Sequence, residues 1–416
     1  MEQAGFKVYG YRWVVLIVYM LVVAINQLMW ITFAPITSDA TQFYKVSDLS
    51  IGLLSMSFMI VYIIFSFPAS WVIDTYGIKV GVGIGAVLTG VFGLLRGILG
   101  ADYNWVLISQ IGIAVGQPFV LNALTTVAAR WFPVRERATA AGMGSLAMYL
   151  GIVVGLALTP YLILRHSIVD MLIIYGSVAL VSSLVFLVFS REQPPTPPCP
   201  AGMEVRSLVL DGLKDALHNK NFLFLMAIFF VGLGAFNAVT TWIENIVAPR
   251  GFSSTQAGII GGLMIVGGVV GAIILPTLSD RYHRRKPFIV MALAGAVVGL
   301  AGITYATSYT LLLVAAFALG FFLLSSGPIG FTYGAEVTYP TPEGTSNGLL
   351  LMMGQISGII FIFGMNALEM PPDNSMTLSM VILIVLMALS LVLSGMLKES
   401  KAPLAAAGPA ETVSKN

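Results

Sequence analysis

Three side chains that can bind a small molecule stand close together early in the sequence. Asn26, Gln27 and Trp30 interrupt an otherwise apolar run, and Trp30 follows the two amides by four and three residues. In a helix this spacing places all three side chains on one face. Two amides and an indole offer hydrogen bonds and a π surface, which is chemistry for binding rather than for breaking bonds.

Further side chains of this kind recur along the chain. Tyr149 and Gln355 lie 206 residues apart, and Asn237 directly follows Phe236. An uncharged site of aromatic faces and amides suits a quaternary ammonium, an amino alcohol or a neutral polar solute, because an aromatic face stabilises a cation by about 0.5–2 kcal/mol. The expected substrate-binding residues are Trp30, Asn26, Gln27, Tyr149, Phe236, Asn237 and Gln355.

Residues suited to catalysis or metal binding are scarce. The single cysteine, Cys199, excludes a disulfide or a cysteine metal cluster within the chain. None of the three histidines falls within an expected membrane span, and there is no Gly-x-x-x-x-Gly-Lys phosphate loop. We therefore expect no enzyme activity, no cofactor, no metal and no nucleic-acid partner.

The composition indicates that lipid surrounds most of the chain. Hydrophobic residues make up 57% and charged residues 10%, against about a quarter charged in ordinary soluble domains. Crossing about 30 Å of hydrocarbon takes about 20 apolar residues in a helix. Twelve such runs are expected, which predicts an all-α membrane protein. They fall near 12–36, 50–73, 80–100, 104–128, 138–163, 170–190, 222–247, 255–279, 287–307, 309–335, 345–367 and 375–397.

Basic residues predict the orientation of these spans. With both termini in the cytoplasm, seventeen of the 21 Lys and Arg residues lie on the cytoplasmic side. Only Lys45, Arg165 and Arg250 lie outside, and Arg96 lies within a span. This asymmetry follows the positive-inside rule. We expect a multi-pass protein of the cell (inner or plasma) membrane that works as a monomer.

The chain divides at a proline-rich connection into two halves. Residues 1–190 and 222–397 are each expected to form a six-helix bundle. The linker 191–221 contains five prolines and then Leu210, Leu213 and Leu217 at helical spacing, which predicts a short amphipathic helix on the membrane surface. The tail 398–416 is expected to be disordered.

Internal repetition relates the two halves. Six pairs of residues share one offset of 206 at corresponding ends of the expected spans. The pairs are Ser47 and Ser253, Gly52 and Gly258, Asp74 and Asp280, Lys79 and Arg285, Thr139 and Thr345, and Gly142 and Gly348. Two parallel six-span repeats with a midplane binding site are an arrangement that moves a solute by alternating access.

The loop around Asp74 carries a first resemblance. Residues 70–79, Ser-Trp-Val-Ile-Asp-Thr-Tyr-Gly-Ile-Lys, resemble the signature loop of the major facilitator transporters, and residues 276–285 keep its acid and its basic end. Such a carboxylate can cap a helix of the other half and pair with its arginines, closing an inner gate. The expected gating residues are Asp74 and Asp280, with Arg130, Arg137, Arg281 and Glu336 as partners.

A second resemblance is to the feline leukaemia virus subgroup C receptor-related transporters. It rests on Phe67-Pro-Ala-Ser-Trp-Val-Ile-Asp-Thr75, on Gly234-Ala-Phe236, and on the segments 346–350 and 355–358. It implies transport of choline and related amines or of haem, with Trp30 and Gln355 at substrate-facing positions. Asn237 departs from this family, which has a second caging aromatic there. Short external loops and the lack of a glycosylation sequon favour a prokaryotic member.

Two charged residues keep other functions open. Glu244 and Arg96 are expected toward the outer ends of their spans, and no titratable residue is expected at mid-depth. Facilitated diffusion or exchange is therefore favoured over proton coupling, for which Glu244 is the candidate. Arg96 is the candidate counter-charge for the alternative of an organic-anion (mono- or dicarboxylate) transporter. A drug efflux pump is a third possibility, because the 20 methionines can form adaptable apolar walls.

Overall fold

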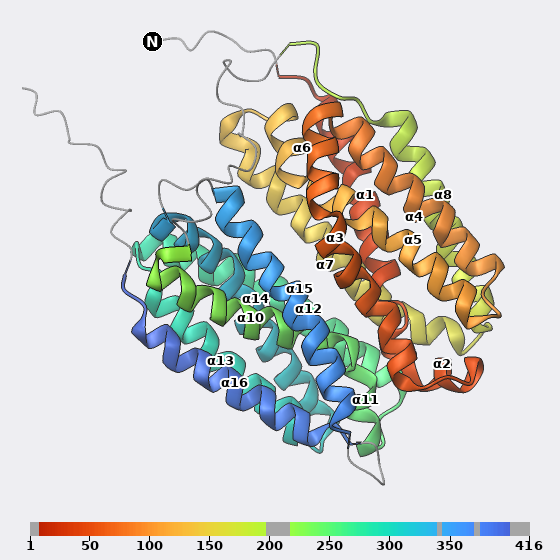
Figure 1. The fold of residues 1–416 in the computed structure, drawn as a ribbon, viewed down its shortest axis with the longest axis vertical. Helices are drawn as coiled ribbons and strands as arrows, with labels where there is room; N and C mark the ends of the chain where they lie inside the picture. Colours follow the sequence, from red (N-terminus) through yellow and green to blue (C-terminus); the bar gives the residue numbers. More distant parts are fainter. Residues whose placement is uncertain (1–7, 197–216, 339–342, 370–374, 400–416) are drawn as a thin grey trace, which may run out of the picture.

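The computed structural model describes residues 8–196, 217–338, 343–369 and 375–399. In these residues twelve helices are long and apolar enough to cross a membrane, and no strand occurs. They form two bundles, the N-terminal half and the C-terminal half, which lie side by side in Figure 1. The expected fold is confirmed. The predicted amphipathic helix and most of the predicted linker and tail lie outside the described residues.

The N-terminal half contains six membrane spans, two of which are interrupted. Its elements are α1 (Tyr11–Ile31), η1 (Ala34–Ile36), α2 (Thr37–Tyr44), α3 (Asp48–Tyr76), α4 (Ile78–Ile98), α5 (Tyr103–Leu121), α6 (Leu124–Trp131), α7 (Val134–Ile163) and α8 (Ile168–Phe189). Pro35 starts the short η1 turn after α1. The fourth span breaks between α5 and α6, after Pro118.

The C-terminal half repeats this order. Its elements are α10 (Lys220–Thr241), α11 (Ile243–Val247), η2 (Ala248–Arg250), α12 (Ser254–Tyr282), α13 (Lys286–Tyr305), α14 (Tyr309–Thr338), α15 (Glu343–Ala367) and α16 (Thr377–Met396). Helix N-caps explain one of the six residue pairs that share the offset of 206, namely Ser47 and Ser253. Ser47 accepts a hydrogen bond from the backbone N–H of Ser50 before α3, and Ser253 accepts one from Gln256 before α12. Both satisfy orphan donors of a helix N-terminus.

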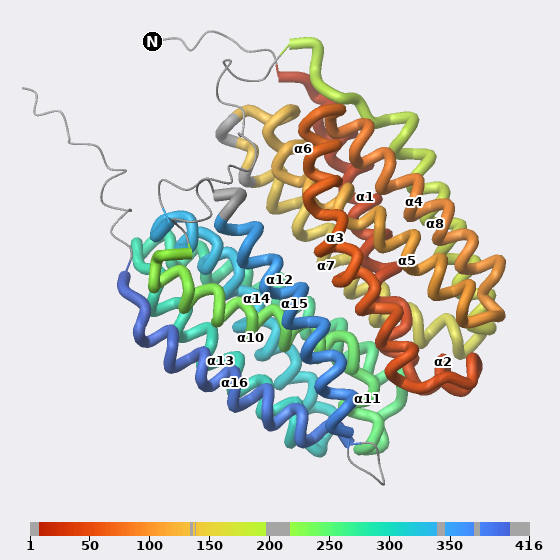
Figure 2. The backbone as a smooth tube through the Cα atoms, in the orientation of Figure 1, coloured from red at the N-terminus to blue at the C-terminus, as the bar shows by residue number. Residues whose placement is uncertain are grey.

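The two halves touch at one end of the molecule. We call this the outer end, because α1 begins and α16 ends at the opposite, inner end, which the basic residues predict to be cytoplasmic. At the outer end α7 packs on α12, and α3 packs on α15. Figure 2 shows α2 and α11 at this end, while the tubes of the two halves diverge toward the chain ends.

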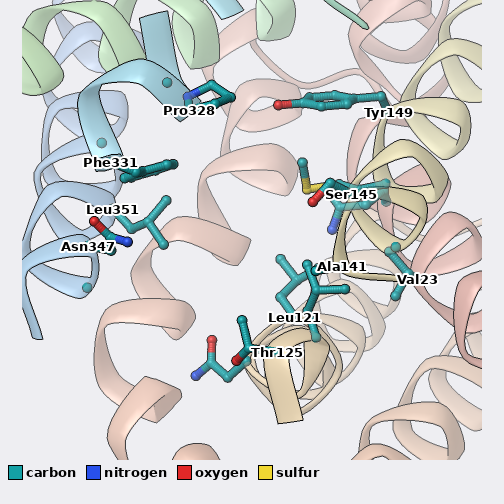
Figure 3. A pocket seen from close by; sticks show the side chains of 18 of the residues that line it. Val23, Leu121, Thr125, Ala141, Ser145, Tyr149, Pro328, Phe331, Asn347 and Leu351 are labelled. Carbon is teal, nitrogen blue, oxygen red and sulfur yellow. The ribbon is translucent and has the colours of Figure 1, made fainter. Parts of the chain in front are cut away.

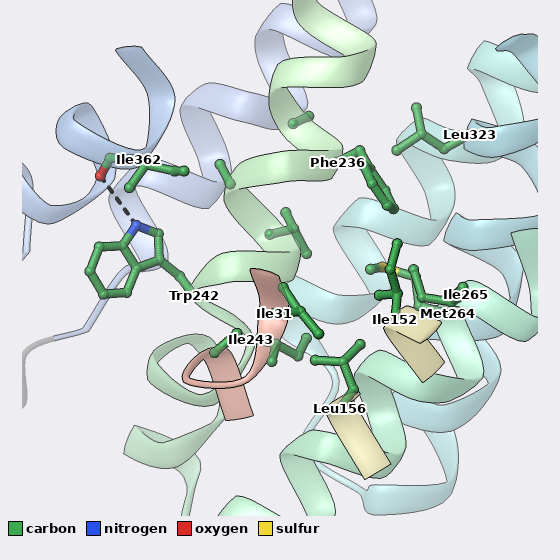
Figure 4. Close-up of a cluster of buried hydrophobic side chains, with 14 of the residues drawn as sticks. Ile31, Ile152, Leu156, Phe236, Trp242, Ile243, Met264, Ile265, Leu323 and Ile362 are labelled. Atoms are coloured by element: carbon green, nitrogen blue, oxygen red, sulfur yellow. Dashed lines mark hydrogen bonds between the residues drawn. The ribbon is translucent and has the colours of Figure 1, made fainter. Parts of the chain in front are cut away.

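Close backbone packing joins α7 to α12. A Cβ on Gly258 would collide with the carbonyl oxygen of Leu156. On the other flank, a Cβ on Gly52 would come within 2.6 Å of the indole of Trp242, whose Nε1–H donates to the carbonyl of Ile362 at 3.2 Å. Figure 4 shows this hydrogen bond beside the apolar cluster that closes the outer end. Glycine is required at both positions because only hydrogen fits there.

Candidate functional site

A cavity of about 2120 Å³ lies between the two halves. Its lining reaches from Trp30 and Phe236 near the outer closure to Asp74, Arg130 and Pro194 at the inner end. The cavity therefore opens at the inner end, and with the orientation that the basic residues predict this is an inward-open arrangement. Among the described lining residues only Asp74 and Arg130 are charged, and both lie at this mouth.

The first span contributes two of its three predicted residues to the cavity. Gln27 and Trp30 line it, and each is largely covered, at 3% and 6% exposed. The indole Nε1–H of Trp30 donates to the carbonyl of Ser55 at 3.2 Å, which fixes the ring. With this donor used, Trp30 offers a ligand its ring and no N–H group.

Asn26 does not line the cavity, which corrects the expectation that it contacts substrate. It is fully buried, and its Nδ2 donates to Thr89 Oγ1 at 3.0 Å. Its Oδ1 accepts from Gln27 Nε2 at 3.3 Å. The two amides share a helix face only approximately, because consecutive residues are 100° apart around a helix. Asn26 thus orients Gln27 from behind.

Tyr149 and Gln355, the pair at equivalent positions of the two halves, both line the cavity. Figure 3 shows the Tyr149 ring extending from the N-terminal half with its hydroxyl directed toward Pro328 of the opposite half. No hydrogen bond within the described residues engages the hydroxyl of Tyr149 or the amide of Gln355. Both groups remain available to a ligand.

Phe236 and Asn237 also line the cavity. Figure 4 shows Phe236 pointing toward Leu323 and away from α15. Asn237 Nδ2 donates to the carbonyl of Gly354 at 3.1 Å, so this amide anchors α10 to α15. A Cβ on Gly358 would lie 2.9 Å from the same nitrogen. Asn237 therefore supplies one free acceptor oxygen, not an aromatic wall.

A polar network that the sequence did not predict lies on the inner part of the cavity wall. Asn122 stands at the break between α5 and α6, accepts from the hydroxyl of Tyr62 at 2.7 Å, and donates to Ser66 and Ser70 of α3 at 3.1 and 3.0 Å. All four side chains line the cavity. The one sequence signal was Pro118, which loosens the helix one turn before Asn122.

Arg96 lies outside the cavity, in the core of the N-terminal half. It is fully buried, and its guanidinium donates to Gln110 Oε1 at 2.6 Å and to the carbonyl of Met29 at 3.0 Å. The ring of Phe33 lies 5.7 Å away. These contacts argue against the alternative of a substrate-facing counter-charge, because the neutral amide and carbonyl hold this cation in a structural position.

Glu244 also lies outside the cavity, at the outer closure. It is 2% exposed, and its Oε2 accepts the backbone N–H of Ser38 at 3.0 Å. Burial, the largest effect, raises the pKa of Glu244 to about 7, against hydrogen bonds from Ser38 and Ser254 that lower it. Glu244 therefore lies on the contact between the two halves and away from the cavity.

Within the described residues, the salt bridges of Arg130, Asp280 and Glu336 each join groups at the inner end of one half. Asp280 and Glu336 both pair with Arg285. Arg281 is exposed, and Asp280 pairs with Arg285, which was not among the predicted partners. This is expected of an open inner end, because the partners in the other half are out of reach.

In the N-terminal half the corresponding partner is a residue that the sequence analysis missed. Glu192 pairs with Arg130 and accepts the backbone N–H groups of Ile78 and Lys79 at 3.0 and 2.8 Å. Arg137 instead donates to the carbonyl of Phe132. No short-range pattern marks Glu192, since it lies 113 residues from the helix that it caps.

An equivalent cap exists in the C-terminal half. Glu399 accepts the backbone N–H groups of Arg285 and Lys286, at 2.6 and 3.3 Å. Carboxylates at helix N-termini complement the helix dipole. Each half therefore uses a carboxylate after its last span to hold the start of its third span.

This fold and central cavity define a membrane transporter of small molecules. The chain belongs to the Major Facilitator Superfamily, whose family model matches residues 19–362. It is similar to Solute carrier family 49 member A3 of Xenopus tropicalis, with 30% identity over 89% of this chain and 80% of that protein. It is also similar to the choline/ethanolamine transporter FLVCR2 of Rattus norvegicus, with 28% identity over 86% of this chain and 70% of that protein.

A solved structure has the same fold. A bacterial homologue of the human lysosomal transporter Spinster, in an inward-facing and unoccupied conformation, superposes with a TM-score of 0.72. The two sequences are 16% identical, and the match covers 94% of this chain and 98% of the other. This likeness concerns the fold.

Proposed function

We propose that this chain carries a small amine or amino alcohol, such as choline, across the membrane by alternating access, through facilitated diffusion or exchange. The observation that supports the substrate class is the deep part of the cavity, where Trp30 and Phe236 offer aromatic faces. Gln27, Tyr149 and Gln355 add neutral hydrogen-bonding groups there. Desolvated aromatic faces favour a cation without an opposing carboxylate.

The similarity to choline/ethanolamine transporters supports the same substrate class. Asn237 distinguishes this chain from the family that it resembles, because it places an amide oxygen where that family has an aromatic ring. An amide oxygen accepts a hydrogen bond from the hydroxyl or N–H group of an amino alcohol, whereas the methyl groups of a trimethylammonium offer it no such donor. The organic-anion alternative loses its counter-charge, since Arg96 is committed to Gln110 and Met29. We therefore favour ethanolamine and choline over carboxylates.

A thermal-stability screen of the purified protein tests the substrate class. A ligand that binds the folded state raises the melting temperature by mass action. Choline and ethanolamine are expected to raise it in a saturable way, whereas succinate and lactate are expected to leave it unchanged. Stabilisation by carboxylates alone would refute the proposal. Counterflow of labelled choline in proteoliposomes then tests transport.

A further inference from the structure

The closed outer end contains two carboxylates that share one hydroxyl group. Ser254 Oγ of α12 lies 3.1 Å from Glu244 Oε1 and 3.1 Å from Asp39 Oδ2 of α2. Glu244 and Ser254 belong to the C-terminal half, while Asp39 and the Ser38 N–H that bonds Glu244 belong to the N-terminal half. We call these four residues the outer latch. Two of its three contacts, Ser38 with Glu244 and Ser254 with Asp39, join the two halves and must break when the outer end opens.

If both carboxylates are charged, the outer latch has one hydrogen atom too few to form both hydrogen bonds of Ser254. A serine hydroxyl has a single hydrogen to donate, so it can satisfy Asp39 or Glu244 but not both. At the other carboxylate, a lone pair of Ser254 Oγ would then face a lone pair of the carboxylate oxygen, which is repulsive. A proton on Glu244 resolves this conflict: Glu244 donates to Ser254 Oγ, and Ser254 donates to Asp39.

No cation in the described part of the chain neutralises the latch. Within the described residues, Glu244 and Asp39 form no salt bridge. Arg250 of η2, the nearest basic residue along the chain, donates to the backbone carbonyls of Ile303, Ala306 and Ile246.

The other charged groups of the packed elements are also committed or distant. Asp48 of α3 accepts from Asn245 at 2.6 Å, and Lys45 at the end of α2 is exposed. η1 carries no ionisable residue, and the charged residues of α10 and α12 (Lys220, Asp280 and Arg281) lie at the inner ends of these helices. A proton is therefore the positive charge that fits this closed contact.

We propose that the outer end closes around one proton held by Glu244, so that acid on the outer side favours the inward-open state. Glu244 and Asp39 do not line the cavity, so this proton enters from and returns to the outer side. It sets the balance between the two states and does not travel with substrate. This inference goes beyond the proposed substrate and does not depend on it.

The direction of the effect follows from linkage. Burial in the closed latch raises the pKa of Glu244 from 4.5 to about 7, and hydration in an open latch returns it toward the ordinary value. The proton on Glu244 therefore stabilises the closed outer end. This stabilisation is fully present below the pKa that Glu244 has in the open state, and it is lost as the pH rises through about 7. The outer end is expected to open more in alkali.

Distance measurements between spin labels test the proposal without any substrate. Labels at Asn104→Cys and Thr307→Cys, exposed positions at the outer ends of the two halves, report opening once Cys199 is replaced by Ser. The short-distance population is expected to fall between about pH 6 and pH 8. Glu244→Gln, which keeps the neutral shape, is expected to remain closed across this range.

Two further variants complete the test. Asp170→Asn changes an exposed carboxylate at the outer end and is expected to keep the wild-type pH response. Asp39→Asn removes the neighbouring negative charge that helps to raise the pKa of Glu244, and it is expected to shift the midpoint to lower pH. A pH-independent population in the wild type, or an unchanged midpoint in Glu244→Gln, would overturn the proposal.

Discussion

Ser38 and Glu244 hold equivalent positions in the two halves, 206 residues apart, and they hydrogen-bond to each other at 3.0 Å. Residues related by a twofold axis can touch only where they lie close to that axis. The contact therefore marks where the pseudo-symmetry axis leaves the molecule at the outer end. The repeat that relates Asp74 to Asp280 in the sequence thus becomes a physical contact between the two repeated units.

Close packing at this end predicts the effect of adding one methyl group. Gly258→Ala would place a Cβ against the Leu156 carbonyl, and overpacking of this kind costs about 1–3 kcal/mol. We expect the variant to shift the protein away from the inward-open state, measured by the same spin-label distances. Gly262→Ala is the matched control, because its nearest contact would be at 3.9 Å. Equal behaviour of the two variants would contradict the packing argument.

Substitution of Trp30 tests the aromatic part of the proposed site. Trp30→Ala removes a face worth about 0.5–2 kcal/mol to a cation, so choline affinity is expected to fall about 2- to 30-fold. Trp30→Phe keeps a ring and is expected to retain most of the affinity. The choline affinity of both variants is measured from the rise in melting temperature with increasing choline concentration. Equal losses in the two variants would point instead to the hydrogen bond between Trp30 and Ser55.

Arg96 predicts a change in stability without a change in selectivity. Arg96→Gln removes charge-assisted hydrogen bonds to Gln110 and Met29, each worth about 1.5–3 kcal/mol. We expect a lower melting temperature, while the ratio of choline to carboxylate affinity stays unchanged. Arg165→Gln, at an exposed outer position, serves as the control and is expected to melt as the wild type does. A variant that melts normally but changes its substrate preference would revive the organic-anion function.

The two terminal carboxylates predict paired effects at the inner end. Glu192→Gln and Glu399→Gln each weaken a charged cap on a third span, at a cost of about 0.5–2 kcal/mol. Both variants are expected to lower the melting temperature. Glu136→Gln weakens a surface pair with Arg12, worth about 0–1 kcal/mol, and is expected to have a smaller effect. Unfolding in nanodiscs, followed by tryptophan fluorescence, compares the three.

Local patterns were sufficient to predict most of the fold. Apolar runs identified all twelve spans, and the paired serines before α3 and α12 are helix caps that a short motif reveals. Interruptions of spans were missed, because hydropathy continues across Pro35 and across the break at Asn122. A helix break changes backbone geometry without changing the mean polarity of the run.

The binding site was less accessible to sequence reasoning. Gln27 and Asn26 are adjacent and equally polar, yet one lines the cavity and the other faces Thr89. For Arg96 and Glu244 the sequence predicted the depth in the membrane but not whether the side chain faces the cavity. Helical spacing shows which residues share a face of a helix, but it does not show which face is turned toward the central cavity. Glu192 and Glu399 act on helices more than a hundred residues away, which no local pattern can show.

The two flanks of the outer closure differ although their sequences are related by the repeat. Leu156 and Ile362 are also 206 residues apart, but α12 meets Leu156 backbone to backbone, whereas the ring of Trp242 stands between Gly52 and Ile362. Trp242 and Ile362 both belong to the C-terminal half, so the indole hydrogen bond and the position of the ring survive when Gly52 moves away. The two flanks should therefore expose different surfaces when the outer end opens. The α7–α12 flank would uncover backbone at Leu156 and Gly258, and the α3–α15 flank would uncover a fixed aromatic ring.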